Sequence, residues 1–164
     1  MKKRVFLFFV LLAAAVYSIF AAHRDLPEMT VIDEYVVDSE LMHLLPLRVS
    51  VMKGDASVMA EQALRLISAG HDTNRKIRRL APENGRSMSV SVSGSVASVD
   101  LRSAYFANRF SNRDTERLFV YQVVNTLTSI DGIDRVSFTI DSEKQKRLAG
   151  FVDMREVFVP DYFV

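Results

Sequence analysis

The densest group of cations beyond the N-terminus lies in the string Asn74-Arg75-Lys76-Ile77-Arg78-Arg79. Such a cluster can attract an anionic wall polymer, lipid headgroups or an acidic protein partner. The alternative is a solvated connector, because charged side chains mostly face water. The candidate binding residues are therefore Arg75, Lys76, Arg78 and Arg79, and both interpretations stay open at this point.

No motif for catalysis or for a cofactor accompanies this cluster. The histidines are His23, His43 and His71, and none has a second histidine or a carboxylate at the spacing of a metal site. Neither a Gly-x-Ser-x-Gly elbow nor a phosphate-binding glycine loop is present. The chain has no cysteine, which excludes disulfides and thiol chemistry. We expect a protein that is not an enzyme and that uses no metal or cofactor.

Four acidic residues fall near the ends of one predicted helix–strand unit: Asp131, Asp134, Asp141 and Glu143. Their oxygens are the ligands that hard divalent cations prefer. The same residue types also cap helices and close turns. We expect capping and turn chemistry here rather than a metal site.

The N-terminus begins with Lys2-Lys3-Arg4 and continues with the uncharged run Val5–Ala22. This run has 18 residues, or about 27 Å as a helix, which is close to the thickness of a bilayer core. The three cations should stay in the cytoplasm. We expect a single-pass anchor in the cytoplasmic membrane, with everything after His23 on the other side.

A cleaved signal peptide is the competing interpretation of the same segment. Such peptides end in a small-x-small cleavage site. Cutting after Ala22 would place Phe20 near the cut, and cutting after Ala21 would place Ile19 there. These large residues favour an uncleaved anchor, although cleavage and release into the periplasm or medium would also export the C-terminal part.

Charge and length limit the possible functions and the number of domains of the exported part. Three of the 21 cations and none of the 20 acidic residues precede residue 23, so the remainder carries 18 cations against 20 acids. A formal charge of −2 argues against nucleic-acid binding, which needs a basic surface. The remaining 142 residues suit one domain.

Two strands and a helix are predicted in the first half of this domain. Residues 30–37 are rich in β-branched side chains, and residues 47–51 alternate between apolar and polar, with Pro46 at the start of that strand. Asp55 or Ser57 can cap the following helix, and Gly70 can end it. Its buried stripe should consist of Ala56, Ala60, Ala63, Leu64 and Ile67.

A hairpin, a second helix and a third strand region are predicted in the second half. Met88, Val90 and Val92 alternate with serines, and a turn at Ser93-Gly94 would pair Val90 with Ala97 and Met88 with Val99. Tyr105, Phe106 and Phe110 should fill the core. Asn112 or Asp114 can cap a helix that buries Leu127 and ends at Asp131-Gly132-Ile133, before a strand at 136–140.

The order of these elements predicts an α+β fold. Two helices, each with one apolar face, suit one side of a mainly antiparallel sheet, which gives a sandwich of two layers. We divide the chain into the anchor at 1–22, a connector with the first strand at 23–45, and the main domain at 46–164.

Two blocks of this domain resemble a known family. The strings Ser91-Val92-Ser93-Gly94-Ser95-Val96-Ala97-Ser98-Val99-Asp100-Leu101 and Val120–Thr128 with Ile130–Phe138 are similar, in sequence and spacing, to the GerMN domain of sporulation and spore germination. The resemblance covers roughly Ala56–Val159. It implies a fold related to the ring-building domains of secretion machines, which associate edge to edge, and it implies no catalytic residues.

We therefore expect a tethered envelope protein that acts through protein–protein association. Its partners would be envelope or membrane proteins, with self-association also open, and its role would lie in sporulation or germination if the host forms spores. The alternative is an extracytoplasmic ligand-binding domain or a hydrolytic domain acting on cell-wall material. A deep pocket lined by Asp and Arg would favour that alternative.

Overall fold

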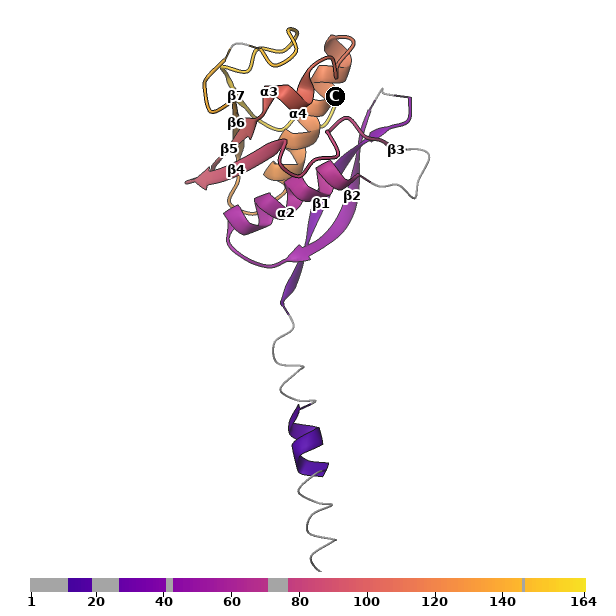
Figure 1. Cartoon of the computed structure of the whole chain (residues 1–164), viewed down its shortest axis with the longest axis vertical. Helices are drawn as coiled ribbons and strands as arrows, with labels where there is room; N and C mark the ends of the chain where they lie inside the picture. The colour runs from indigo at the N-terminus through magenta and orange to yellow at the C-terminus, as the bar shows by residue number, and fades with distance from the viewer. Residues whose placement is uncertain (1–11, 19–26, 41–42, 71–76, 146) are drawn as a thin grey trace, which may run out of the picture.

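The computed structural model describes residues 12–18, 27–40, 43–70, 77–145 and 147–164. Its strands form two sheets rather than one (Figure 1). The first sheet has the order β2-β1-β3 and the second has the order β4-β5-β6-β7. The strands are β1 (Met29–Asp38), β2 (Leu44–Met52), β3 (Ile77–Arg78), β4 (Met88–Ser93), β5 (Val96–Leu101), β6 (Arg135–Ile140) and β7 (Val157–Phe158).

The helices of the domain are α2 (Ala56–Ala69), α3 (Ser103–Phe106) and α4 (Arg113–Thr128). The predicted caps are confirmed: Asp55 accepts a hydrogen bond from the Val58 amide at 2.9 Å, and Asn112 accepts one from the Thr115 amide at 2.9 Å. Gly70 ends α2 with φ of +67°. Each long helix contacts both sheets, since α2 touches β4 as well as β1 and β2, and α4 touches both β6 and β1.

The α+β class is confirmed, but the predicted two-layer sandwich on a single sheet is wrong. Apart from its short pairing with β3, the edge of β1 that faces away from β2 bonds to side chains at the C-terminal end of α4. Thr126 Oγ1 accepts from the Tyr35 amide at 2.9 Å, and Ser129 Oγ bonds both the amide and the carbonyl of Asp33. Helix side chains thus occupy positions that a further strand would need, so the two sheets stay separate.

The pairing of β5 with β6 is parallel, although β4–β5 and β6–β7 are antiparallel. The chain leaves β5, forms α3 and α4, and returns to the end of the sheet where β5 began. There the amides of Asp134 and Arg135 donate to the Ser95 carbonyl at 2.9 and 3.2 Å. This return through a helix is the usual route to a parallel pair.

The hairpin exists, but its predicted register is wrong. Val90 pairs with Val99 and Met88 with Leu101, so the turn is Gly94-Ser95. Gly94 has φ of +58°, whereas Ser95 does not have a positive φ. A type II′ turn needs glycine at its first central position, which places Gly94 there. Because the partner shifts by two residues, each side chain keeps its predicted face.

The core lies where α2 and α4 meet the second sheet. Leu127, Phe119, Val99 and Leu101 are fully buried, as are Ala60 and Ala63, which let α2 approach closely. Phe106 and Phe110 are buried as predicted, but Tyr105 is 39% exposed and does not fill the core. A one-turn α3 points Phe106 inward, and its neighbour therefore faces out.

The predicted anchor, residues 5–22, lies mostly outside the described residues. Its described part, residues 12–18, is helical. Within the parts of the chain that the structure describes, no helix has the length and apolar character needed to cross a membrane.

Candidate functional site

The basic cluster is divided by the structure. Arg75 and Lys76 lie outside the described residues, and Arg78 is exposed on β3. Arg79 instead forms an ion pair with Glu83 and donates from Nη1 to the Ala69 carbonyl at 2.9 Å, at the end of α2. A Cβ on Gly70 would lie 2.8 Å from Arg79 Cδ. Arg79 therefore closes the C-terminus of α2 and is not a free surface cation.

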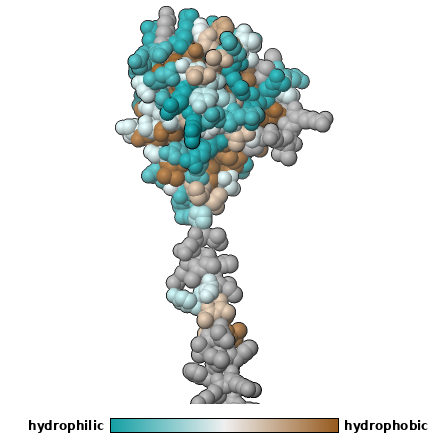
Figure 2. Space-filling view, viewed as in Figure 1, coloured by the Kyte–Doolittle hydropathy of each residue, from teal (hydrophilic) through white to brown (hydrophobic). Residues whose placement is uncertain are grey.

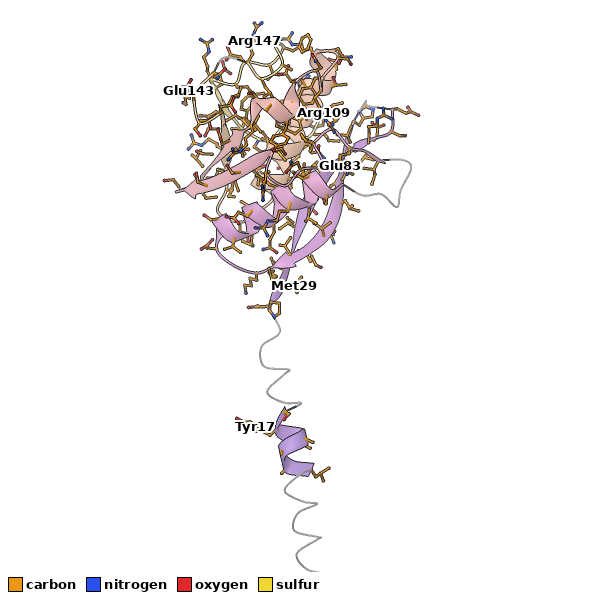
Figure 3. All side chains as sticks on the ribbon, in the orientation of Figure 1. Tyr17, Met29, Glu83, Arg109, Glu143 and Arg147 are labelled. Atoms are coloured by element: carbon orange, nitrogen blue, oxygen red, sulfur yellow. The ribbon has the colours of Figure 1, made fainter. Side chains whose placement is uncertain are left out.

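Arg109 has a similar structural role next to Arg79. Its Nε donates to the Leu80 carbonyl at 2.7 Å and its Nη2 to the Ala81 carbonyl at 2.6 Å. Partial burial, and then the charge of Arg79, lower the pKa of Arg109. Figure 3 shows Arg109 and Glu83 on the same side of the domain, near α2. The two arginines hold the connection that leads to β4.

The acidic candidates are spread among turns. Asp141 accepts from the amide and hydroxyl of Ser103, at the start of α3. Asp100, which is not one of the candidates, accepts from Thr139 and from the Ser142 amide. Among the described residues, no group of three or more metal-binding side chains occurs. His43 is exposed, and His23 and His71 lie outside the described residues. The carboxylates of Asp100 and Asp141 therefore serve the fold by binding backbone amides and hydroxyl groups of neighbouring segments.

A buried carboxylate that sequence reasoning missed holds the loop after β6. Glu116 is fully buried near the start of α4. It accepts from the amides of Ala149, Phe151 and Val152 at 3.0, 2.9 and 3.1 Å. The only signal in the sequence is an acidic residue on an otherwise buried stripe of the helix.

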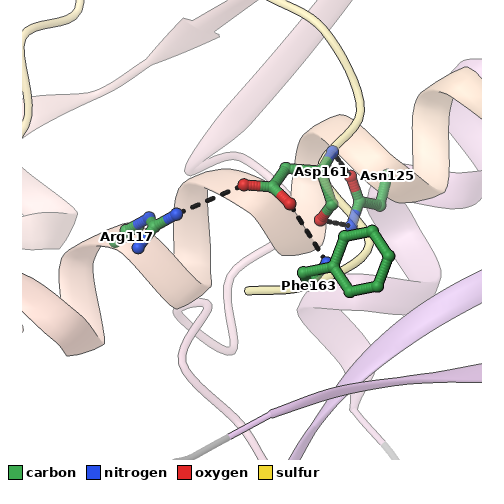
Figure 4. Close-up of polar contacts among 4 residues, drawn as sticks. All are labelled: Arg117, Asn125, Asp161 and Phe163. Carbon is green, nitrogen blue, oxygen red and sulfur yellow. Dashed lines mark hydrogen bonds and ion pairs between the residues drawn. The ribbon is translucent and has the colours of Figure 1, made fainter.

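The C-terminal segment is fixed to α4 by a second polar side chain (Figure 4). Asn125 Nδ2 donates to the Asp161 carbonyl at 2.7 Å, and the Asp161 amide donates to Asn125 Oδ1 at 3.0 Å. Arg117 pairs with the Asp161 carboxylate at 3.2 Å, and the Phe163 amide also donates to that carboxylate. One asparagine thus bonds this segment as a neighbouring strand would.

Tyr35 of β1 joins this segment to the first sheet. Its ring stacks on Tyr162 with centroids 5.7 Å apart. Burial, followed by the proximity of Tyr162 and Asp33, raises the pKa of Tyr35. The Leu44 amide of β2 donates to the Val164 carbonyl at 3.2 Å. The last residues therefore tie α4 to the first sheet.

Grooves open on the described surface, and three of them are lined as follows. One of about 420 Å³ is lined by charged and apolar side chains: Arg113, Asp114, Arg117, Tyr121, Val152, Asp153 and Phe158. A second, of about 530 Å³, lies between α3 and residues 148–151, and Ser103 and Asn108 line it together with alanine, leucine and phenylalanine residues. The third, of about 200 Å³, lies between α2 and β4. None brings together a nucleophile and a base in a way that indicates a reaction.

Comparisons with known proteins identify the family. A sequence model of the family Germane, described as sporulation and spore germination, matches residues 26–146, which is more than half of the chain. No curated protein matches the sequence. The family match includes β1 and β2 as well as the two blocks that carry the resemblance.

Solved structures show the same fold. The first GerMN domain of the sporulation protein GerM from Bacillus subtilis has a TM-score of 0.58 at 20% identity, over 76% of this chain and 92% of that one. The tandem GerMN domains of the same protein give 0.62 at 18% identity, over 80% of this chain and 46% of the tandem chain. A Clostridium perfringens protein described as a lipoprotein gives 0.56 at 12% identity, over 81% and 87%.

At these identities the structural likenesses establish the fold, and the sequence match establishes the family. The chain aligns with about half of the tandem protein, as expected for one domain of two. The chain belongs to the Germane family of sporulation and spore germination, and its domain is of the GerMN type.

Proposed function

We propose that this protein is a membrane-tethered, extracytoplasmic GerMN domain that acts by binding other envelope proteins during sporulation or spore germination, without catalysing a reaction. The family match over residues 26–146 carries this proposal. The tether would be residues 5–22, with Lys2, Lys3 and Arg4 retained in the cytoplasm by their charge.

The shape of the domain supports an adaptor that presents one end to a partner. Met29, where β1 begins, lies at one end of the domain, and Glu143 and Arg147 lie at the other (Figure 3). On the face in Figure 2, hydrophilic side chains predominate and hydrophobic ones form small patches between them. A tether entering at Met29 would leave the opposite end free to meet other proteins.

The basic cluster gives a direct test of partner binding. We would reverse Arg75, Lys76 and Arg78 to glutamate and keep Arg79, because Arg79 holds the end of α2. The matched control reverses three exposed cations outside the cluster, Arg86, Arg102 and Arg135. Chemical cross-linking in host membranes then measures partner capture by the full chain.

We expect the cluster variant to lose most of its capture while its thermal midpoint stays within a few degrees, because exposed charges add little to stability. The control variant should keep its capture. Equal capture by both variants would show that the cluster is not part of the binding surface. The topology is tested separately: a reporter enzyme that is active only outside the cytoplasm, fused after Val164, should be active.

A second candidate function rests on the groove lined by Arg113, Asp114 and Asp153. This mixture of Arg and Asp is the lining expected for a domain that binds or hydrolyses wall material. However, Arg117 is paired with Asp161 and Asp153 with Arg155. Hydrolysis of purified peptidoglycan by the full chain, abolished by Arg113→Ala with Asp114→Asn, would establish this alternative over the adaptor.

A further inference from the structure

The outer edge of β4 differs from the other three edges of the two sheets. Such edges carry unpaired N–H and C=O groups and are normally protected by short length, proline, charge or a covering segment. β3 and β7 have two residues each, and Pro160 closely follows β7. These two edges are therefore too short to pair with another chain.

The edge of β2 is covered. Pro46 has no N–H to offer, the Leu44 amide bonds the Val164 carbonyl, and the Met52 amide and carbonyl bond the side chain of Gln62 in α2. Arg48 adds an exposed charge to the same strand. Along the described part of this edge, only Arg48 and Ser50 keep both an N–H and a C=O open.

The edge of β4 has none of these protections: it is not short, and it carries no proline, no charge and no covering segment among the described residues. The strand reads Met88-Ser-Val-Ser-Val-Ser93, six residues without proline or charge. The Arg102 amide bonds the Ser87 carbonyl, so by alternation the groups of Met88, Val90 and Val92 point away from β5. Among the described residues, no hydrogen bond is made to these outward groups. The outer edge of β4 therefore offers the N–H and C=O groups of three residues to an added strand.

A groove runs along this open edge. Its wall on β4 is formed by three consecutive residues, Met88, Ser89 and Val90, so the strand presents its edge there rather than one of its faces. The opposite wall is one stripe of α2, comprising Glu61, Leu64 and Arg65. Figure 1 shows α2 next to β4, at the end of the sheet.

The dimensions of the groove determine which occupant fits. Its volume of about 200 Å³ can hold one apolar side chain from an added strand, against Leu64 and Met88, but it cannot hold a helix or a second sheet. Glu61 and Arg65 pair with each other at 3.4 Å, so the rim carries no net charge. A single extended and uncharged segment would pair with the outward backbone groups of β4 and suit the rim without net charge.

We propose that the groove between β4 and α2 binds an extended peptide segment of a partner protein, which adds as a fifth strand beside β4. The segment carries an apolar side chain facing Leu64, with small or polar residues on either side of it. This proposal rests on the proposed role in protein association and assigns the surface and the chemistry of the partner.

The first experiment identifies a peptide with the full chain held in detergent micelles. Random linear peptides displayed on phage are selected on the protein, and affinities of synthetic copies are measured by fluorescence polarisation. We expect enriched sequences with apolar residues at alternate positions. Methylating the peptide nitrogens that face β4 should weaken binding at least about tenfold, because it removes the N–H donors that pair with β4. The side chains of the peptide stay the same, so the loss reports on backbone pairing.

Matched variants then locate the site. Val90→Pro removes one outward N–H of β4, and Ser50→Pro makes the same change at an open position of the β2 edge. Gly85→Phe tests the groove without backbone strain, because a Cβ at Gly85 meets no atom within 4 Å. We expect Val90→Pro and Gly85→Phe to weaken binding at least about tenfold, and Ser50→Pro to leave it unchanged.

Hydrogen exchange gives a readout independent of the variants. The Val90 and Val92 amides should exchange fast in the free protein and at least about tenfold more slowly with peptide bound. Binding without this protection, equal loss with Ser50→Pro, or no peptide selected would overturn the proposal. If the Val90 and Val92 amides became protected at high protein concentration without peptide, and the particle mass doubled, the edge would instead bind a second copy of this chain. Partner capture in membranes that survives Val90→Pro would reject this edge but leave the proposed function standing.

Discussion

The hairpin of β4 and β5 takes its form from neighbouring residues, whereas the segment 147–164 is held by side chains of α4 that lie 33 to 44 positions earlier. In the hairpin, alternation selects the faces and Gly94 selects the turn. Among the described residues after β6, regular structure is limited to the two residues of β7 and an isolated bridge. Glu116 and Asn125 supply the bonds there that a strand partner would otherwise supply.

This contrast shows that one domain can combine two kinds of stability. In the hairpin, each cross-strand pair of side chains contributes its own small part of the stability. A substitution in one pair should therefore lower the stability by that part alone. The C-terminal segment depends on two side chains that each satisfy several backbone groups, so one substitution there should release many residues. Substitutions at α4, at the two anchoring side chains and at the turn can test this difference.

The largest expected effect comes from Leu127→Ala, which opens the core that both regions share. Leu127 is fully buried in α4. We expect a loss of about 2–5 kcal/mol in the free energy of unfolding, the usual range for a core leucine. Urea unfolding measures it, with Leu45→Ala at a 48% exposed position as control. A loss under about 0.5 kcal/mol would mean that α4 does not bury this face.

Glu116→Gln should come next and should act mainly on the C-terminal segment. The amide keeps the shape of the side chain but has one acceptor oxygen in place of two, and it puts a donor opposite a backbone N–H. We expect a loss of about 2–3 kcal/mol, since bonds to a charged acceptor are stronger than neutral ones. Hydrogen exchange should accelerate at Ala149, Phe151 and Val152 and stay slow in β5.

The control for Glu116→Gln is Asp114→Asn, which makes the same change of charge at an exposed position in the first turn of the same helix. It should cost a few tenths of a kcal/mol through the helix dipole alone. If the two variants were equally stable, the three amide bonds to Glu116 would contribute nothing and the contrast between the regions would fail.

Much of the fold was predictable where the determinants are local. Asp55, Asn112 and Gly70 were predicted as helix boundaries because caps depend on adjacent backbone groups. The separation into two sheets was not, because it depends on Thr126 and Ser129 reaching β1 across more than 90 positions. Alternation assigns a strand its faces but not its partner, so the parallel β5–β6 pair was also missed.

The candidate site shows the same limit. A run of cations indicates a basic surface, but only the position of the Ala69 carbonyl shows that Arg79 serves the end of α2. The open edge of β4 depends likewise on what covers the other edges. Its uncharged alternating sequence was visible, but its place at the end of a sheet was not.

Asn125→Ala tests the second anchor and should cost about 2 kcal/mol, because the amide and carbonyl of Asp161 both lose their partner. Asn125→Asp separates the two bonds, since aspartate keeps an acceptor for the Asp161 amide but loses the donor. Because the new carboxylate would be buried and would face the Asp161 carbonyl, we expect Asn125→Asp to destabilise at least as much as Asn125→Ala in urea unfolding. Limited proteolysis should cut both variants after residue 156 sooner than the parent, with the hairpin intact.

Gly94→Ala has the smallest expected effect and tests the other side of the comparison. Nothing lies within 4 Å of a Cβ at this position, so any cost comes from φ of +58° rather than from contacts. We expect about 1–2 kcal/mol, the cost of a left-handed residue with a side chain. Gly85→Ala, in equally open space but without a positive φ, should cost nothing or stabilise slightly by restricting the unfolded chain.

Because the strain at Gly94 is local, hydrogen exchange should accelerate only near the turn, and residues 147–164 should keep their protection. Release of that distant segment by Gly94→Ala would show that the two regions unfold together, in which case the bonds to Glu116 and Asn125 would not define a separate unit of stability.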